Sequence, residues 1–144
     1  MKRKLVPMAL AMVLGLVILN CTSPQPPPTM SIEEIKKAAS PVLYDDLMRH
    51  NENYIGKIVY YRGEVRQVSH NYGNKYFLRV ATKDSFDNVI WVNYEGERLL
   101  EDDIIDVWAK VKGLKTYEAI LGNKITIPEL DSLHVELVTK AGAR

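Results

Sequence analysis

Histidine, cysteine and carboxylate side chains carry most enzyme chemistry, and this 144-residue chain places few of them where they could act together. Its three histidines, His50, His70 and His134, have no second histidine, cysteine or carboxylate at metal-ligand spacing, and no nucleophile motif is present. The single cysteine, Cys21, excludes an internal disulfide. We therefore expect a protein that is not an enzyme, with no catalytic residue and no cofactor.

An acidic cluster is the one feature that could hold a metal ion. Glu101, Asp102, Asp103 and Asp106 offer several carboxylate oxygens, the ligand type that Ca²⁺ requires. The segment lacks the regularly spaced carboxylates and the glycine of a calcium-binding loop. We interpret it as a solvated turn that leads into a strand, and we expect no metal site.

The N-terminus has the pattern of an export signal. Residues 2–4 are basic and residues 5–19 form an apolar run, which is typical of a secretory signal peptide. The sequence Ile18-Leu19-Asn20-Cys21 resembles the lipobox of bacterial lipoproteins, with Asn20 where a small residue is usual. The resemblance implies lipid attachment at Cys21 and an extracytoplasmic protein that is anchored to the membrane.

An uncleaved transmembrane anchor is the main alternative for these residues. The apolar run contains Pro7 and Gly15, and it is shorter than the ~20 residues that span a bilayer core comfortably. Either interpretation tethers the remaining chain outside the cytoplasm. Directly after Cys21, residues 22–29 hold four of the seven prolines, which favours an extended spacer between the membrane and the rest of the chain.

The charge balance argues against attraction to nucleic acid. The whole chain has 19 basic and 18 acidic residues. Three of the basic residues are at positions 2–4, so removal of the signal leaves 16 basic against 18 acidic residues, a net charge of −2. Such a chain has no long-range attraction to phosphate polymers or to anionic lipid.

The sequence from residue 31 onward predicts two short helices followed by strands. Ser31 and Glu34 have the spacing of a capping box, so a helix is expected over Ile32–Ala39, with Pro41 preventing its extension. A second helix is expected from Tyr44 to about His50. From residue 57 the hydrophobic pattern changes to period two, which predicts five strands, Lys57–Val68, Lys75–Thr82, Val89–Tyr94, Ile104–Lys112 and Leu130–Val138.

The strand pattern also indicates how the sheet closes. Gly63 interrupts the long first strand, and glycine in a strand commonly marks a bend where the sheet curls. A long, bent first strand can pair at both ends, which lets five strands close into a barrel without open edges. In the last strand, Leu133, Val135 and Leu137 are expected to face inward.

A resemblance to a known fold supports this interpretation. The turn glycines and core positions at Ile55-Gly56-Lys57, Gly63-x-Val65, Leu78-x-Val80, Leu100-x-x-Asp103 and Val107-x-Ala109-x-Val111-x-Gly113 resemble the OB-fold. The similarity covers Tyr54–Val138 and is greatest to the small OB-like domains of extracytoplasmic lipoproteins. It implies a mainly β fold, a five-stranded OB-fold-like barrel that follows one or two short helices.

These observations divide the chain into five parts. We predict a lipoprotein-type signal peptide over 1–20, a lipidated cysteine with a proline-rich linker over 21–30 and a short helical segment over 31–54. The OB-fold-like β-barrel is expected over 55–139, followed by a C-terminal tail over 140–144.

The resemblance also implies where a ligand would bind. OB barrels bind ligands across the second and third strands and the adjacent loops. Aromatic side chains stack on bases or sugars there, and arginine pairs with phosphate or carboxylate. The candidate ligand-binding residues are Arg62, Arg66, Tyr72, Tyr76, Phe77, Arg79, Trp91 and Tyr117. The alternative for each aromatic residue is packing at a barrel end or beneath the helices.

The segment Leu114–Ile127 is a second candidate region. We expect it to form a loop over the mouth of the barrel, because long loops in compact domains are often functional. A short hairpin within it would instead give it a structural role. Together these features predict a non-catalytic, membrane-tethered module that binds a protein, peptide or glycan of the cell envelope. The alternative is an OB-fold protein that binds single-stranded nucleic acid.

Overall fold

The computed structural model describes residues 29–143, so the predicted signal peptide, the lipid attachment at Cys21 and most of the linker lie outside the described residues. Two short helices, α1 (Ile32–Ala38) and α2 (Tyr44–Arg49), precede the strands. The predicted capping box of α1 is confirmed, because the Glu34 amide donates to Ser31 Oγ and the Ser31 amide donates to Glu34 Oε2. No helix within residues 29–143 has the length and apolar character needed to cross a membrane.

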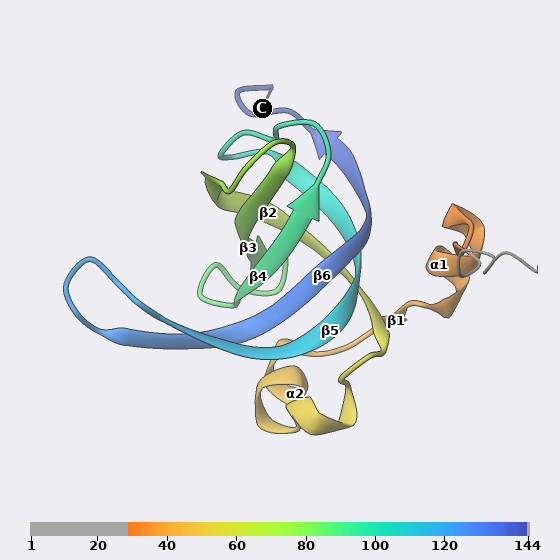
Figure 1. Cartoon of the computed structure of the whole chain (residues 1–144), viewed down its shortest axis with the longest axis horizontal. Helices are drawn as coiled ribbons and strands as arrows, with labels where there is room; N and C mark the ends of the chain where they lie inside the picture. Colours follow the sequence, from red (N-terminus) through yellow and green to blue (C-terminus); the bar gives the residue numbers. More distant parts are fainter. Residues whose placement is uncertain (1–28, 144) are drawn as a thin grey trace, which may run out of the picture.

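A closed barrel of five strands forms the body of the molecule (Figure 1). Its sheet runs in the order β2-β3-β4-β6-β5 and closes where β5 pairs with β2. The mainly β, OB-like fold expected from the sequence is confirmed. The strands are β2 (Ile58–His70), β3 (Lys75–Thr82), β4 (Val89–Glu95), β5 (Ile104–Glu118) and β6 (Lys124–Thr139).

Two further elements connect the helices to the barrel. A two-residue strand, β1 (Ser40–Pro41), pairs in parallel with Val59 and Tyr60 at the start of β2. A 3-10 turn, η1 (Asn51–Asn53), leads from α2 into the barrel. The sequence does not predict β1, because a two-residue strand has no periodicity of its own.

Gly63 marks the bend of β2, as the sequence predicts. The first part of β2 pairs with β5 and the second part with β3, and Gly63 belongs to both ladders, opposite Ile105 and Thr82. A Cβ atom at this position would lie 2.3 Å from the Ala81 carbonyl oxygen. The glycine therefore allows β2 and β3 to approach closely where the sheet curls.

The inward-facing side chains fill the barrel. Alternate residues of β2 are buried as the pattern predicts, among them Val59 and Val65, whereas on β5 the residues from Ile105 to Ala109 are all buried. On β6, however, the expectation for Leu133 is wrong, since it is 39% exposed, whereas Leu137 lies opposite the buried Ile105 and faces inward, although it is 43% exposed. Leu133 is the extra residue of a bulge: Trp108 is opposite His134 and Ala109 is opposite Ser132, so the alternation of β6 is interrupted there.

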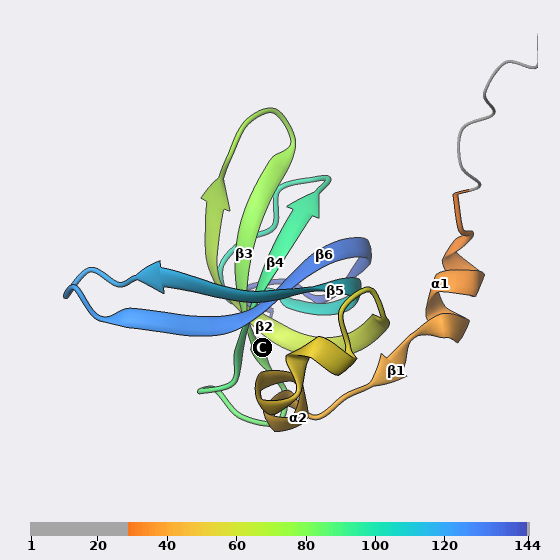
Figure 2. The ribbon, with the colours of Figure 1, turned by 60° about the horizontal axis from the view of Figure 1, so that its bottom comes forward.

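The segment Leu114–Ile127 does not form the expected loop. It continues β5 and β6 as a two-stranded arm, from the pair Leu114–Pro128 to the pair Glu118–Lys124. Figures 1 and 2 show this arm extending away from the barrel, at the opposite end of the molecule from α1. The hairpin alternative is the correct one, although the hairpin is longer than expected. The turn at its tip contains Gly122 at φ +82°, a conformation that glycine adopts without strain.

Candidate ligand-binding groove

A groove with a volume of about 720 Å³ lies between the arm and the strands β2, β3 and β4. The barrel side is formed by Gln67, Ser69, Phe77, Arg79 and Trp91, and the arm contributes the other wall from Tyr117 to Ile125. Clefts of a few hundred cubic ångströms with apolar linings and a few polar groups are typical small-molecule sites. The groove has this character.

Three aromatic rings form a continuous row in the groove. Phe77 on β3 lies 5.4 Å from Trp91 on β4, and Trp91 lies 5.8 Å from Tyr117 on β5, as measured between ring centroids. All three side chains are half-buried, with one side packed against the protein. Such a row offers flat apolar surface to a ligand at little cost in side-chain entropy.

Two basic side chains lie against these rings. The Arg79 guanidinium is 5.1 Å from the centroid of the Tyr117 ring, and the Lys115 ammonium is 4.8 Å from that of Trp91. Both are within the distance at which a cation is attracted to the face of an aromatic ring. Arg79 Nη1 also donates to Gln67 Oε1 at 3.2 Å. The groove therefore combines stacking surface with positive charge.

A hydrogen-bond network fixes the orientation of Trp91. Its indole Nε1 donates to Asn93 Oδ1 at 3.1 Å, and Asn93 Nδ2 donates to Glu129 at 3.0 Å and to Asp131 at 2.6 Å. Lys112 lies 3.4 Å from Glu129 and 3.8 Å from Asp131. The carboxylates are thus partly neutralised and continue the groove surface toward β6.

Two buried polar atoms of the groove lack partners. Arg79 Nε and Tyr117 Oη make no hydrogen bond with any of residues 29–143. A buried donor without an acceptor costs about 1–3 kcal/mol. A ligand oxygen that enters beside Tyr117 and displaces the guanidinium from the ring would satisfy such a donor.

The structure brings together four of the predicted ligand-binding residues and separates the other four. Phe77, Arg79, Trp91 and Tyr117 line the groove. Tyr76 does not, because neighbouring residues of a strand point to opposite faces, and it packs against Tyr94 with ring centroids 6.2 Å apart.

The remaining three predicted residues lie outside the groove. Tyr72 is in the β2–β3 turn, 62% exposed, and its hydroxyl accepts from Lys75. Arg62 pairs with Asp106 near the start of β2, and Arg66 pairs with Glu64. Both arginines lie on β2 outside the groove lining, each in an ion pair with a carboxylate.

Several residues of the site were not predicted from the sequence. Lys115, Asn93 and Gln67 each contact a predicted residue, as described above. The i, i+2 spacing of Trp91 and Asn93 in a strand was a signal that both face the same side. The apolar tip of the arm, Ile120 and Leu121, was also missed, because its segment was interpreted as a loop.

The acidic cluster has structural partners. Asp103 accepts hydrogen bonds from the amides of Leu100 and Ala141, and Asp106 accepts two from Arg62 and one from Tyr60. The Arg62 guanidinium lowers the pKa of Asp106 below its ordinary value, and the Tyr60 hydroxyl acts in the same direction. In the described part of the chain no three histidine, cysteine or carboxylate residues are grouped so as to hold a metal ion.

The comparisons with known proteins concern the fold. No protein-family model matches the chain, and no curated protein matches its sequence. The structure is similar to that of a protein described as an aspartyl-tRNA synthetase from Leishmania major Friedlin, with a TM-score of 0.52 and 18% sequence identity. The match covers 75% of this chain and 22% of that one, so this chain corresponds to only a part of the larger protein. At this identity the likeness shows a shared fold.

Proposed function

We propose that this chain is a non-catalytic binding module that holds an extended ligand in the groove between the barrel and the arm. The row of Phe77, Trp91 and Tyr117 carries the proposal, because rings that each contact the next form a surface on which successive flat groups can stack. Arg79 and Lys115 then bind polar or anionic groups at the edges of the same surface.

The first candidate ligand is a peptide or glycan of the cell envelope. The N-terminal sequence supports an extracytoplasmic, membrane-anchored location with lipid on Cys21. The groove contains the carboxylate of Glu118 as well as cations, and Glu129 lies beside Lys115, which suits a ligand that is uncharged or carries both signs. Sugar rings and aromatic side chains both present the flat apolar faces that the row of rings can stack against.

The second candidate ligand is single-stranded nucleic acid. Two observations favour it: the fold is similar to that of a protein named as an aspartyl-tRNA synthetase, and aromatic rings with adjacent cations are the usual platform for unpaired bases. Against it stands the net charge of −2 without the signal. Salt distinguishes the two candidates. Binding of nucleic acid should weaken as the salt concentration rises, because neutralised phosphates release counterions, whereas binding of an uncharged glycan or peptide should not.

Fluorescence titration of the full chain distinguishes these ligands. The chain has two tryptophans, so Trp108→Phe leaves Trp91 as the reporter in the groove. The probes are a β-linked N-acetylglucosamine oligomer, a mixed-sequence peptide library and a 12-nucleotide oligothymidylate, each at low and high salt. We expect one class to change the Trp91 emission, and Arg79→Gln to weaken its binding. Arg98→Gln, an exposed arginine outside the groove, is the matched control.

The outcome assigns the ligand class. Binding of the glycan or peptide that persists in high salt supports the envelope module. Binding of oligothymidylate that falls steeply with salt supports the nucleic-acid alternative. If all three probes leave the Trp91 emission unchanged at millimolar concentration, or if Arg79→Gln and Arg98→Gln have equal effects, the groove is not the binding site.

A further inference from the structure

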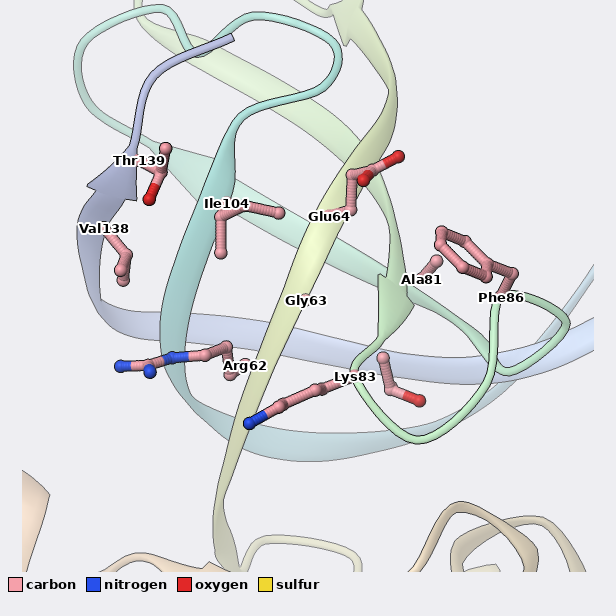
Figure 3. A pocket seen from close by; sticks show the side chains of 10 residues that line it. Arg62, Gly63, Glu64, Ala81, Lys83, Phe86, Ile104, Val138 and Thr139 are labelled. Carbon is pink, nitrogen blue, oxygen red and sulfur yellow. The ribbon is translucent and has the colours of Figure 1, made fainter. Parts of the chain in front are cut away.

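A second hollow lies on the outer face of the barrel and shares no lining residue with the groove (Figure 3). Its volume is about 430 Å³, and it is centred on the bend of β2 at Gly63. The side chains around it come from β2, β3, β5, β6 and the turn that follows β3. Its size is within the range of small-molecule sites, about 300–1,000 Å³.

The hollow exists because the outer face of β2 is uncovered at this point. Gly63 presents only backbone to this face, because its position points inward with Val59 and Val65, and its outward-facing neighbours Arg62 and Glu64 turn toward ion-pair partners. Arg62 makes two hydrogen bonds of 2.7 Å to Asp106, and Glu64 pairs with Arg66 at 3.1 Å. On the adjacent strand β3 the residue beside the hollow is the small Ala81.

The walls of the hollow are apolar. Ile104 and Val138 form one side and the ring of Phe86 the other, as Figure 3 shows. Phe86 is 71% exposed and Val138 is 44% exposed, so both present apolar surface to solvent. The Phe86 ring is held by Arg66, whose guanidinium lies 5.8 Å from its centroid. An apolar group placed over Gly63 would therefore be enclosed on two sides.

One end of the hollow carries an uncompensated positive charge. Glu64, the carboxylate that lines it, is paired with Arg66, and Arg62 in the same lining is paired with Asp106. Lys83, by contrast, makes no ion pair with any residue between 29 and 143, and its ammonium lies beside the Arg62 end in Figure 3. Thr82 lines the same end, is 4% exposed and has no hydrogen-bond partner for Oγ1 within the described residues.

We propose that this hollow is a second binding site, for a small amphipathic carboxylate. The apolar body of the ligand lies over Gly63 between Phe86 and Val138, and its carboxylate pairs with the Lys83 ammonium. This arrangement buries apolar surface on both sides and gives the lysine the anion that it lacks. The site is independent of the groove and of the ligand proposed there.

Nuclear magnetic resonance titration of the ¹⁵N-labelled full chain tests this site. The probe is 4-phenylbutanoate, and the uncharged 4-phenylbutan-1-ol is its matched control. We expect both to shift the amide signals of Gly63 and Ala81, with the carboxylate binding roughly fivefold or more tightly because its hydrogen bond to lysine is charge-assisted. The signals of Trp91 and Asn93 in the groove should stay unchanged.

Two exposed residues separate the charge from the apolar contact. Lys83→Gln should weaken the carboxylate to the affinity of the alcohol and leave the alcohol unaffected, whereas Phe86→Ala should weaken both. Lys37→Gln, an exposed lysine on α1, should change neither. The proposal is overturned if the two probes bind equally, if Lys83→Gln does not affect the carboxylate, or if the shifts fall on exposed apolar residues elsewhere such as Leu133.

Discussion

At the scale of single residues, the site depends on how Trp91 is held. Its indole N–H has one partner, Asn93, and the amide of Asn93 is in turn shared between Glu129 and Asp131. A tryptophan held in this way would lose little side-chain freedom if a ligand stacked on it. The network therefore pre-organises the aromatic row.

Asn93→Leu should show this effect. The change keeps the size of the side chain but leaves the Trp91 N–H and two carboxylates without their shared partner, which should cost about 1–2 kcal/mol of unfolding free energy. Ligand binding in the groove should weaken as well, because the indole is no longer fixed. Denaturant unfolding and the Trp91 emission measure the two effects. Asn53→Leu, at an exposed position in η1, is the control, and equal loss in both variants would contradict the role of Asn93.

A second residue-scale prediction concerns acid stability. The pKa of Asp106 is lower in the folded protein than in the unfolded chain, mainly because Arg62 donates to it. The folded state therefore favours the ionised carboxylate, and Asp106 adds to the free energy of unfolding. This stabilisation is fully present above the ordinary carboxyl pKa and is lost as the pH falls through the pKa of Asp106 in the folded protein.

Wild type and Asp106→Asn should accordingly differ in unfolding free energy at pH 7, and the difference should shrink as the pH falls below the ordinary carboxyl pKa. Thermal unfolding across this range measures the difference. Asp87 is an exposed aspartate in the β3–β4 turn, so the unfolding free energy of Asp87→Asn should change with pH in the same way as that of wild type. A difference between wild type and Asp106→Asn that does not change with pH would show that the carboxylate charge is not responsible.

At the scale of elements, β2 determines the shape of the barrel. It is the strand that pairs with both β3 and β5, and the change from one partner to the other occurs at Gly63. Glycine is needed here for close approach of two backbones rather than for an unusual φ angle, since a Cβ would meet the Ala81 carbonyl. The bend also exposes the hollow on the outer face.

Gly63→Ala should therefore destabilise the barrel strongly. The new methyl group meets backbone, which cannot move aside as a side chain can, so we expect a loss of about 3 kcal/mol, at the upper end of the range for overpacked cores. Gly73→Ala is the comparison, because its φ of +58° adds strain but no atom lies within 4 Å. It should cost about 1 kcal/mol. The denaturant midpoints of the two variants measure the difference, and a smaller loss for Gly63→Ala than for Gly73→Ala would contradict the steric role of Gly63.

The arm is the second element with a separable role. Its strands pair only with each other beyond the barrel, and Ile120 and Leu121 at its tip are 105% and 88% exposed. Nothing in the described fold packs on these two side chains, yet they line the groove. If the groove binds a ligand as proposed, we expect these two side chains to contact it.

The double variant Ile120→Ser, Leu121→Ser should leave the unfolding free energy within about 0.5 kcal/mol of wild type, as exposed substitutions usually do. Binding of the groove ligand should weaken measurably in the same preparation. The fluorescence titration and denaturant unfolding give the two quantities. Unchanged binding would show that the tip takes no part in the site.

The elements also show what the sequence could predict. Period-two alternation located four of the strands, an apolar run located β4, and the capping box of Ser31 and Glu34 located α1, because these are local patterns. The arm escaped prediction because Gly113, Gly122 and Pro128 punctuate it as they would a loop, while the pairing of Tyr117 with Ile125 is visible only in space. Part of the groove could be predicted. Alternation on paired strands places Phe77 and Trp91 on the same face of the sheet, and the same alternation excludes Tyr76 from that face.

At the scale of the whole molecule, α1 and the arm lie at opposite ends of the barrel (Figure 2). α1 is held to the barrel by Lys36, which pairs with Glu136 and lies 4.6 Å from the Trp108 ring centroid. If the chain is anchored through Cys21, as its N-terminal sequence predicts, the attachment precedes α1, and the groove lies at the other end of the barrel.

Intact-mass measurement of the membrane fraction tests the anchor. The wild-type protein should lack residues 1–20 and carry the mass of attached acyl chains, whereas Cys21→Ser should keep residues 1–20 and carry no lipid. Fractionation locates both forms. An unmodified wild-type mass that includes the complete N-terminus would instead favour the transmembrane alternative and exclude lipidation.

The pairing of β4 with β6 has a further consequence. Three residue pairs form this parallel ladder, Trp91–Glu129, Val92–Leu130 and Asn93–Asp131, and two of them belong to the network that orients the indole. The floor of the groove is therefore complete only when β4 and β6, which are far apart in the sequence, pair and close the cylinder. A ligand bound there selects the closed cylinder over any partly opened form, and at a hundredfold excess over its dissociation constant it would add about 2.7 kcal/mol to the free energy of opening.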